Sequence, residues 1–240
     1  MNRGGQALYD EHESVRARPR LHGTTILGIC RDGVGAIAGD GQVTYGDMIV
    51  KHGARKVRRL HDGEIVAGFA GAVADAMTLF EKFEIQLRDN RGDLRRASIE
   101  LAREWRTDRY LRRLEAQLIV GDAEQVYVLS GEGDVIQPDD GIVAIGTGAP
   151  YAMAAARALV ANTKLSTIEI VQESMRIASE LCVFTNAHII VEVVALPEAA
   201  AQLDAAAAAT QADTSVNVQM TTGGTSEAAD TPPDMKEPAT

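Results

Sequence analysis

The sequence predicts an α+β domain built from two central sheets with a layer of helices on each outer face. Strand-like and helix-like segments occur in blocks, in the order strands, two helices, strands, two helices, strand. Helices that follow one another in pairs argue against a doubly wound parallel sheet, in which single helices alternate with strands. A chain of 240 residues with 45% hydrophobic content is also long enough to bury one sizeable core.

The first half of the regular sequence predicts four strands and then two helices. Short apolar segments surround the glycine-containing turns DGVG and HDG, which is typical of paired strands. Apolar residues then recur at the spacing of one helix face, and a second such stripe follows. We expect the strands at 24–31, 35–40, 56–60 and 64–71, and the helices at 74–90 and from 93 to about 114.

The second half returns to strands and then adds two more helices. Pro150 fits the first turn of a helix that continues through residue 161, and Ser166 can cap another helix over 166–184. The apolar segment HIIVEVVAL ends the domain as a strand. We expect the strands of this half at 116–122, 125–131, 141–148 and 188–196.

Composition divides the chain into three parts. Residues 1–23 are polar and aperiodic, with charges throughout and no apolar segment of the kind that a secretory signal contains. Residues 24–196 form the regular domain. Residues 197–240 are rich in Ala, Thr, Asp and Pro and cannot bury enough apolar surface to offset the entropy of ordering. We therefore expect a disordered acidic tail, with a short alanine helix at its start.

Several classes of function are excluded by composition and motifs. A net charge of −10 argues against a nucleic-acid partner, and no apolar run is long enough to span a membrane. Two cysteines, Cys30 and Cys182, are too few for a disulfide framework and fit a reducing cytosol. There is no zinc-protease, paired CxxC or P-loop motif. The segment GTGAPY has Tyr151 where a dinucleotide site needs a small residue, so we interpret it as a strand-to-helix turn.

Thr24, the first residue of the regular sequence, has chemistry that depends on its amine. An internal threonine has no base beside its hydroxyl. At a free N-terminus, the α-amine has a pKa of about 7.7–8.0 and can accept the hydroxyl proton. Such a site needs a nearby cation, a carboxylate to hold that cation, and backbone N–H donors for the oxyanion. Asp40, Lys56 and Gly68 are candidates at strand ends, but spacing alone does not select them.

Each candidate also has a purely structural interpretation. Thr24 suits the edge of a strand, and Asp40 precedes a glycine, which is a common turn pair. Lys56 belongs to a basic run that would be solvated on a surface. Cys182 can serve as a small core hydrophobe.

Four long segments of the chain carry a family resemblance. They are TTILGICRDGVGAIAGDGQVTYGD, KVRRLHDGEIVAGFAGAVADAMTLFEKFE, LAREWRTDRYLRRLEA and IVAIGTGAPYAMAAARAL. In this order they resemble the HslV family, the peptidase subunits of bacterial ATP-dependent HslUV proteases, which are related to proteasome β subunits. The resemblance covers roughly residues 24–194. It implies the αββα four-layer sandwich of an N-terminal nucleophile hydrolase, assembled as two stacked hexameric rings that enclose the active sites.

The resemblance implies a role for each residue of a threonine peptidase site. It places the nucleophile at Thr24, the carboxylate at Asp40 in AGDGQ and the cation at Lys56 in KVRRL. The oxyanion donor would be the backbone N–H of Gly68 in AGFAG. Thr147 stands where the family often has serine; it keeps a hydroxyl that can bond the amine or its water, and adds a methyl group.

A cation, a partner and a location also follow from the resemblance. The family has a sodium site built from carbonyl groups in a Gly-x-x-Cys-x-x-Thr pattern, and the matching residues here are Ser179, Cys182 and Thr185. Serine replaces glycine, but its carbonyl remains. We expect no nucleotide site in the chain itself, because it has no P-loop, and the resemblance implies an HslU-type AAA+ ATPase as partner, whose docking would improve the site's geometry. It further implies unfolded proteins as substrates and a place in the bacterial cytoplasm.

Removal of residues 1–23 is needed before Thr24 can act through its amine. Gly23 resembles the junction at which proteasome β precursors process themselves, because glycine can take the tight turn that brings the Thr24 hydroxyl to its carbonyl. A wrongly assigned start codon is an alternative explanation of the additional residues.

Two other functions stay open: an amidohydrolase acting on a small molecule, without ATPase dependence, and a catalytically silent ring subunit. Retention of Thr24, Asp40 and Lys56 together argues against the silent subunit.

Overall fold

The computed structural model describes residues 21–22, 24–203 and 205. The described residues up to Ala199 belong to one unit, and the few described residues after it belong to a second. Residues 197–203 are helical. The extension before residue 21 and the tail beyond residue 205, for which the sequence predicts a removable segment and disorder, lie outside the described residues.

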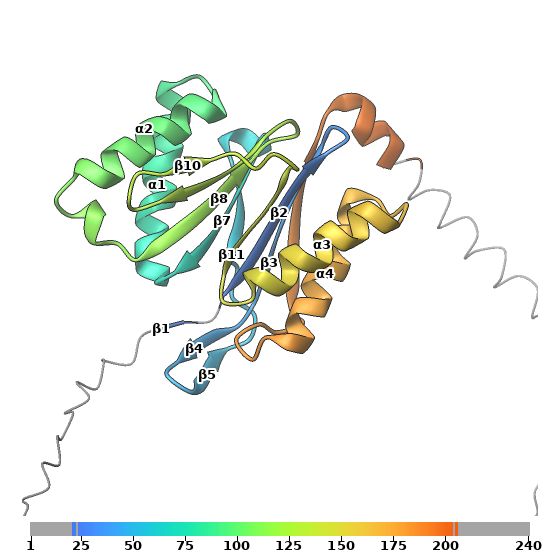
Figure 1. Ribbon diagram of the computed structural model, residues 1–240. Coiled ribbons are helices and arrows are strands. Elements are labelled where there is room, and N and C mark those ends of the chain that lie inside the picture. Colours follow the sequence, from blue (N-terminus) through green and yellow to red (C-terminus); the bar gives the residue numbers. More distant parts are fainter. Residues whose placement is uncertain (1–20, 23, 204, 206–240) are drawn as a thin grey trace, which may run out of the picture. The chain divides into compact units, whose positions relative to one another are not determined.

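Two antiparallel sheets form the centre of the first unit (Figure 1). One has four strands in the order β11-β2-β3-β12. These are β11 (Ile142–Gly146), β2 (Thr25–Arg31), β3 (Val34–Asp40) and β12 (Ile189–Ala195). The other has five strands in the order β10-β9-β8-β7-β6. These are β10 (Val135–Ile136), β9 (Val126–Ser130), β8 (Ala116–Gly121), β7 (Ile65–Gly71) and β6 (Val57–Leu60).

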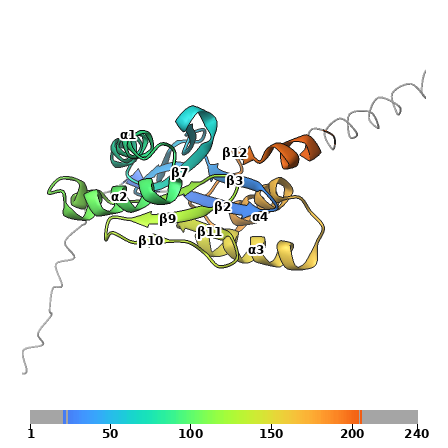
Figure 2. The ribbon, with the colours of Figure 1, turned by 90° about the horizontal axis from the view of Figure 1, so that it is seen from above.

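Helices cover the outer face of each sheet, which gives the four layers that the sequence predicts (Figures 1 and 2). The five-stranded sheet carries α1 (Val73–Asp89) and α2 (Leu94–Thr107). The four-stranded sheet carries α3 (Ala149–Asn162) and α4 (Thr167–Leu181). The predicted fold class and order of elements are confirmed. Among the described residues, no helix has the length and apolar character needed to cross a membrane.

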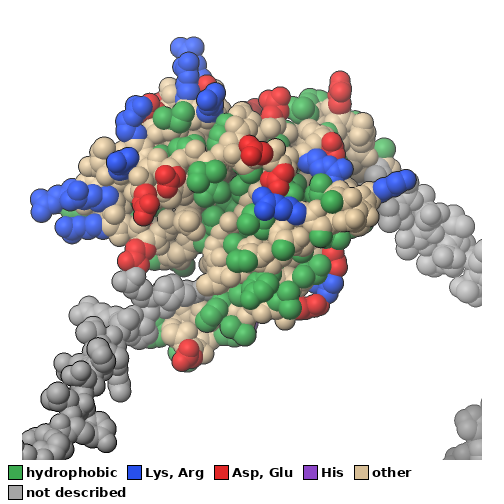
Figure 3. All heavy atoms as spheres, viewed as in Figure 1, with side chains coloured by type: hydrophobic (Ala, Val, Ile, Leu, Met, Phe, Trp, Pro, Cys, Tyr) green, Lys and Arg blue, Asp and Glu red, His purple; other side chains and the backbone are tan. Residues whose placement is uncertain are grey.

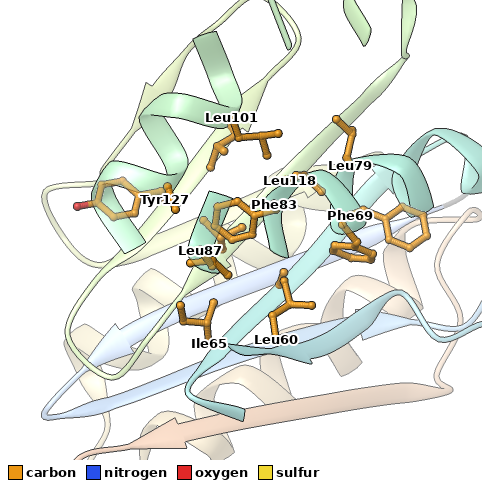
Figure 4. Packing of buried hydrophobic residues seen from close by; sticks show 14 of the residues in the cluster. Leu60, Ile65, Phe69, Leu79, Phe83, Leu87, Leu101, Leu118 and Tyr127 are labelled. Carbon is orange, nitrogen blue, oxygen red and sulfur yellow. The ribbon is translucent and has the colours of Figure 1, made fainter. Parts of the chain in front are cut away.

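Three apolar clusters hold these layers together. The first lies between the five-stranded sheet and its helices and includes Phe69, Phe83 and Leu101 (Figure 4). A second fills the space between the four-stranded sheet and α3 and α4. The third, which includes Ile26 and Ile119, lies between the two sheets. Burial of apolar area at these three levels is the main stabilising term of the fold.

Two helices end earlier than the sequence predicts. The second helix was expected to run to about residue 114, but α2 ends at Thr107. The Asp108 carboxylate accepts the N–H groups of Tyr110 and Leu111, at 2.7 and 2.9 Å, and so starts a separate short 3₁₀ turn at Leu111–Arg113. In the same way α4 ends at Leu181 instead of 184, because Cys182 adopts an extended conformation.

A small third sheet was not predicted. It contains β1 (Leu21–His22), β4 (Val43–Tyr45) and β5 (Met48–Lys51), in the order β1-β4-β5. All four residues of β5 are exposed, so this strand lacks the apolar alternation by which a half-buried strand is found in a sequence.

Candidate active site

Thr24 lies directly before β2, beside the end of β11. Its carbonyl accepts the Thr147 N–H at 2.9 Å and the Thr147 hydroxyl at 3.3 Å. Gly146 has φ +91°, and a Cβ atom there would lie 2.1 Å from the same carbonyl oxygen. Only glycine allows this approach. The turn after β11 therefore holds Thr24, which is 6% exposed.

Asp40 and Lys56 form a buried ion pair next to Thr24. Lys56 Nζ lies 2.9 Å from Asp40 Oδ1, and the side chains are 2% and 0% exposed. The carboxylate also accepts the Thr25 N–H at 2.7 Å and the Gln42 N–H at 2.8 Å. These donors fix the orientation of the carboxylate, so Asp40 holds the ammonium group of Lys56 in place.

Burial lowers the pKa of Lys56 below its usual value, while the charge of Asp40 and its hydrogen bond act in the opposite direction. Desolvation is the larger effect. The ammonium group is therefore more acidic than that of a surface lysine, although its carboxylate partner opposes that change.

Two clefts meet at Thr24 and Gly71. The larger, of about 580 Å³, is lined by Lys56 and by a mostly apolar and basic set: Val43, Val50, Lys51, Ala54, Arg55, Arg58, Phe69, Val73 and Met77. The smaller, of about 240 Å³, is lined by Ala70, Glu115, Ala116, Gln117, Gly146 and Thr147. An extended chain that passes Thr24 would thus find space on both sides.

The structure does not bring Gly68 into this group. Gly68 lies within β7, paired with Val57 on one side and Ile119 on the other. A Cβ atom on Gly68 would lie 2.7 Å from Ile26, between the two sheets. Gly71, at the end of the same strand, lines both clefts instead. The φ of +127° at Gly71 distinguishes it from Gly68, but only the structure reveals this angle. In the sequence, Gly68 and Gly71 are simply the two glycines of the segment GFAG.

Thr25 is a residue that sequence reasoning missed. Its hydroxyl lies 2.6 Å from the Thr185 hydroxyl and accepts the Gly148 N–H at 3.1 Å. These bonds join the start of β2 to the first turn of α3 and to the residues that follow α4. The second threonine of the TTI segment was the available signal, but one sequence does not distinguish it from an ordinary strand residue.

The three residues expected at a sodium site lie at the end of α4. Ser179 is in the last turn of the helix, where carbonyl groups lack intrahelical partners. The Cys182 carbonyl accepts the Thr185 N–H at 3.0 Å and retains a second lone pair. Carbonyl oxygens are ligands that hard cations prefer, so the residues fit such an ion. Among the described residues, no group of three His, Cys, Asp or Glu side chains could hold a metal.

Comparisons with known proteins agree with this fold. A family model described as proteasome subunit matches residues 21–194. The chain is 58% identical over 169 residues to the ATP-dependent protease subunit HslV of Pseudothermotoga lettingae, covering 70% of this chain and 96% of that protein. It is 59% identical over 172 residues to HslV of Desulfovibrio desulfuricans, covering 71% and 97%.

Two solved structures are similar as well. The crystal structure of HslV from Trypanosoma brucei has 47% identity and a TM-score of 0.69, with 72% of this chain and 99% of that chain covered. The Thiobacillus denitrificans protein BPH in complex with epoxomicin has 18% identity and a TM-score of 0.55, covering 72% and 98%, and it supports the fold alone.

Two stacked sheets between helix layers are the architecture of a proteasome-type subunit. The chain belongs to the proteasome subunit family, and within it to the HslV protease subunits.

Proposed function

We propose that the chain is a threonine endopeptidase subunit of an ATP-dependent protease, with Thr24 as its N-terminal nucleophile after removal of residues 1–23. The observation that carries this proposal is the buried pair of Asp40 with Lys56, a residue that lines the same cleft as Thr24. A buried ammonium group beside a threonine amine favours the neutral amine, which can then act as a base.

The proposed reaction has two steps. The Thr24 amine takes the proton from Oγ, and Oγ attacks the peptide carbonyl to form a tetrahedral oxyanion. Collapse breaks the C–N bond, the amine gives its proton to the leaving amine, and an ester to Thr24 remains. Water then attacks the ester with the same amine as base, which releases the acid and restores the hydroxyl. Lys56 lowers the free energy of the developing negative charge.

The N–H of Gly71 is the oxyanion donor that the geometry supports, in place of Gly68. The Phe69 N–H donates to the Lys56 carbonyl at 3.2 Å, so that side of β7 faces the start of β6. Backbone N–H groups of a strand alternate between its two sides, so Gly71, two residues further, faces the same side. Pairing with β6 begins only at Gly68 and Val57. The Gly71 N–H is therefore directed beyond the end of β6, toward the cleft that Thr24 lines.

The larger cleft favours apolar side chains over basic ones. Its body is apolar, including Phe69, Val73 and Met77, while Lys51 and Arg58 add positive charge. A lysine or arginine side chain of the substrate would meet like charges there. We propose that bonds after apolar residues are cleaved preferentially.

Processing at the bond between Gly23 and Thr24 is part of the proposal. Leu21 and His22 form a strand that pairs antiparallel with β4, opposite Tyr45 and Thr44. This pairing supports an extended approach of the N-terminal segment to Thr24, as a substrate would have. Autocatalytic removal would use the same nucleophile.

The remaining parts of the proposal concern assembly. Two stacked hexameric rings and an HslU-type AAA+ ATPase would confine the site, so that unfolded proteins in the bacterial cytoplasm are the substrates. Apolar side chains gather over α3 on the face seen in Figure 3, which supports burial against further copies.

A sodium ion is also part of the proposal. The carbonyl groups of Ser179, Cys182 and Thr185 would hold Na⁺. The ion would fix the turn after α4, in which the Thr185 hydroxyl contacts the Thr25 hydroxyl.

The test assays a small peptide and a stable folded protein, each with and without the ATPase ring and ATP. We expect weak peptide cleavage by the chain alone, stronger cleavage with the ring, and degradation of the folded protein only with both. Thr24→Ala should abolish all three activities. Degradation of the folded protein by the chain alone would contradict the compartmental arrangement, and hydrolysis of small amides without any peptidase activity would favour the amidohydrolase alternative.

A further inference from the structure

Glu192 on β12 contacts two arginines that flank the catalytic lysine. Its Oε1 lies 2.9 Å from Arg55 Nη2, and its Oε2 lies 3.0 Å from Arg59 Nε. The glutamate side chain is 14% exposed, whereas the arginines are far more exposed. Arg59 also donates to the carbonyl groups of Gly63 and Val193.

These contacts connect the same two sheets as the catalytic pair. Asp40 ends β3, and β12 pairs directly with β3, so that Ile189 is opposite Asp40 and Glu192 is opposite Ile37. Lys56, Arg55 and Arg59 all lie at or beside β6, in the other sheet. Lys56–Asp40 and the Glu192–arginine pairs are therefore two bridges from the edge strand β6 of one sheet to the neighbouring strands β3 and β12 of the other.

Lys56 lies at the edge of its own sheet. It directly precedes β6, an edge strand of four residues that pairs with β7 among the strands that the structure describes. Its carbonyl accepts one N–H from that neighbour, that of Phe69. The interface between the sheets is an apolar cluster, whose attraction has no directional preference of its own. The Nζ–Oδ1 distance consequently depends on what holds β6 against the sheet of Asp40.

We propose that Glu192 is a positioning residue of the peptidase: through Arg55 and Arg59 it fixes β6 so that Lys56 reaches Asp40. The expected effect of Glu192 on turnover rests on the proposed function. Its expected effect on the Lys56–Asp40 distance does not. A displacement of about 1 Å in a catalytic group can cost on the order of a hundredfold in rate, so a partial loosening should be measurable.

The experiment compares Glu192→Gln with the matched control Glu173→Gln in the assembled full chain. Glu173 also pairs with an arginine, Arg176, but on the surface of α4 and within one helix. With an uncharged peptide, Glu192→Gln should lower kcat by about tenfold and leave KM within about twofold, whereas the control should change neither. Native mass and denaturant unfolding establish that both variants are assembled and folded.

Two further readouts separate positioning from a general structural role. Arg59→Gln should lower kcat less in the Glu192→Gln background than in the wild-type chain, because the effects of residues that share one contact are not additive. A crystal structure of Glu192→Gln should show Lys56 Nζ beyond hydrogen-bond distance of Asp40. An unchanged Lys56–Asp40 distance, a wild-type kcat or an additive loss would overturn the positioning role. A wild-type chain without peptidase activity would contradict the proposed function, and the crystallographic comparison would still decide the role of Glu192.

Discussion

Lys56 Nζ and Asp40 Oδ1 lie 2.9 Å apart across the interface between the two sheets, with both side chains buried. Lys56 begins the edge of one sheet and Asp40 ends a strand of the other. Their contact therefore depends on the packing of the whole domain, and Thr24 lines the cleft beside it. The catalytic role proposed for Thr24 rests on this relationship.

Removal of the lysine charge should affect both turnover and stability. Lys56→Met differs from deprotonation of Lys56, because it removes the N–H donor to Asp40 Oδ1 as well as the charge. The buried carboxylate is then left without its cation and that donor, and loss of one partner of a buried pair costs about 3–5 kcal/mol. We expect a folded variant with peptide turnover reduced at least about a hundredfold, since the charge acts on the transition state. Peptide kinetics and denaturant unfolding measure the two effects. The control is Lys82→Met, whose pair with Glu104 is partly exposed and should be worth at most about 1 kcal/mol. Wild-type turnover in Lys56→Met would show that this lysine has no catalytic role.

Alkaline pH should reduce activity without unfolding the protein. Burial lowers the pKa of Lys56 below 10.5. As pH rises through the lowered pKa, the folded protein loses the ammonium charge while the unfolded chain still binds that proton. Stability that derives from this group therefore rises with pH between the two pKa values. We expect peptide turnover to fall in this window while the contribution of Lys56 to the free energy of unfolding increases. Turnover that stays constant up to pH 10.5 would be inconsistent with a required ammonium group.

Gly71 should not tolerate a side chain. Its φ is +127°, and a Cβ atom would lie 2.2 Å from the Glu115 carbonyl oxygen. Gly71→Ala must therefore displace the backbone that carries the proposed oxyanion donor, and loss of one such donor costs on the order of a hundredfold or more in kcat. Gly53→Ala is the control, because the nearest atom to its new Cβ would be 3.5 Å away. Comparable kinetics of the two variants would remove Gly71 from the site.

The spacing of apolar residues along the sequence predicted most of the fold, because most helices and strands are half-buried and repeat their apolar residues at a regular interval. The helix stripe that contains Phe80 and Phe83 packs on the five-stranded sheet, and Ser166 caps α4 with a capping box. The early end of α2 was missed, because it depends on which backbone groups the Asp108 carboxylate accepts. The hairpin of β4 and β5 was missed because its outer strand is exposed.

The site was only partly predictable. Family resemblance placed Thr24, Asp40 and Lys56, which the structure brings together. It did not distinguish Gly68 from Gly71, because backbone N–H groups alternate between the two sides of β7 and only Gly71 lines the cleft. The contribution of Glu192 depends on the packing of one sheet on the other, which no local pattern encodes.

The intact mass of the catalytically active protein tests the central claim most directly, because the proposed base is the α-amine of Thr24 itself. We predict that purified active assemblies begin at Thr24, and that Thr24→Ala, which cannot process itself, retains residues 1–23. A preparation that cleaves peptides at the full rate while every chain still begins with Met1 would contradict the N-terminal nucleophile mechanism.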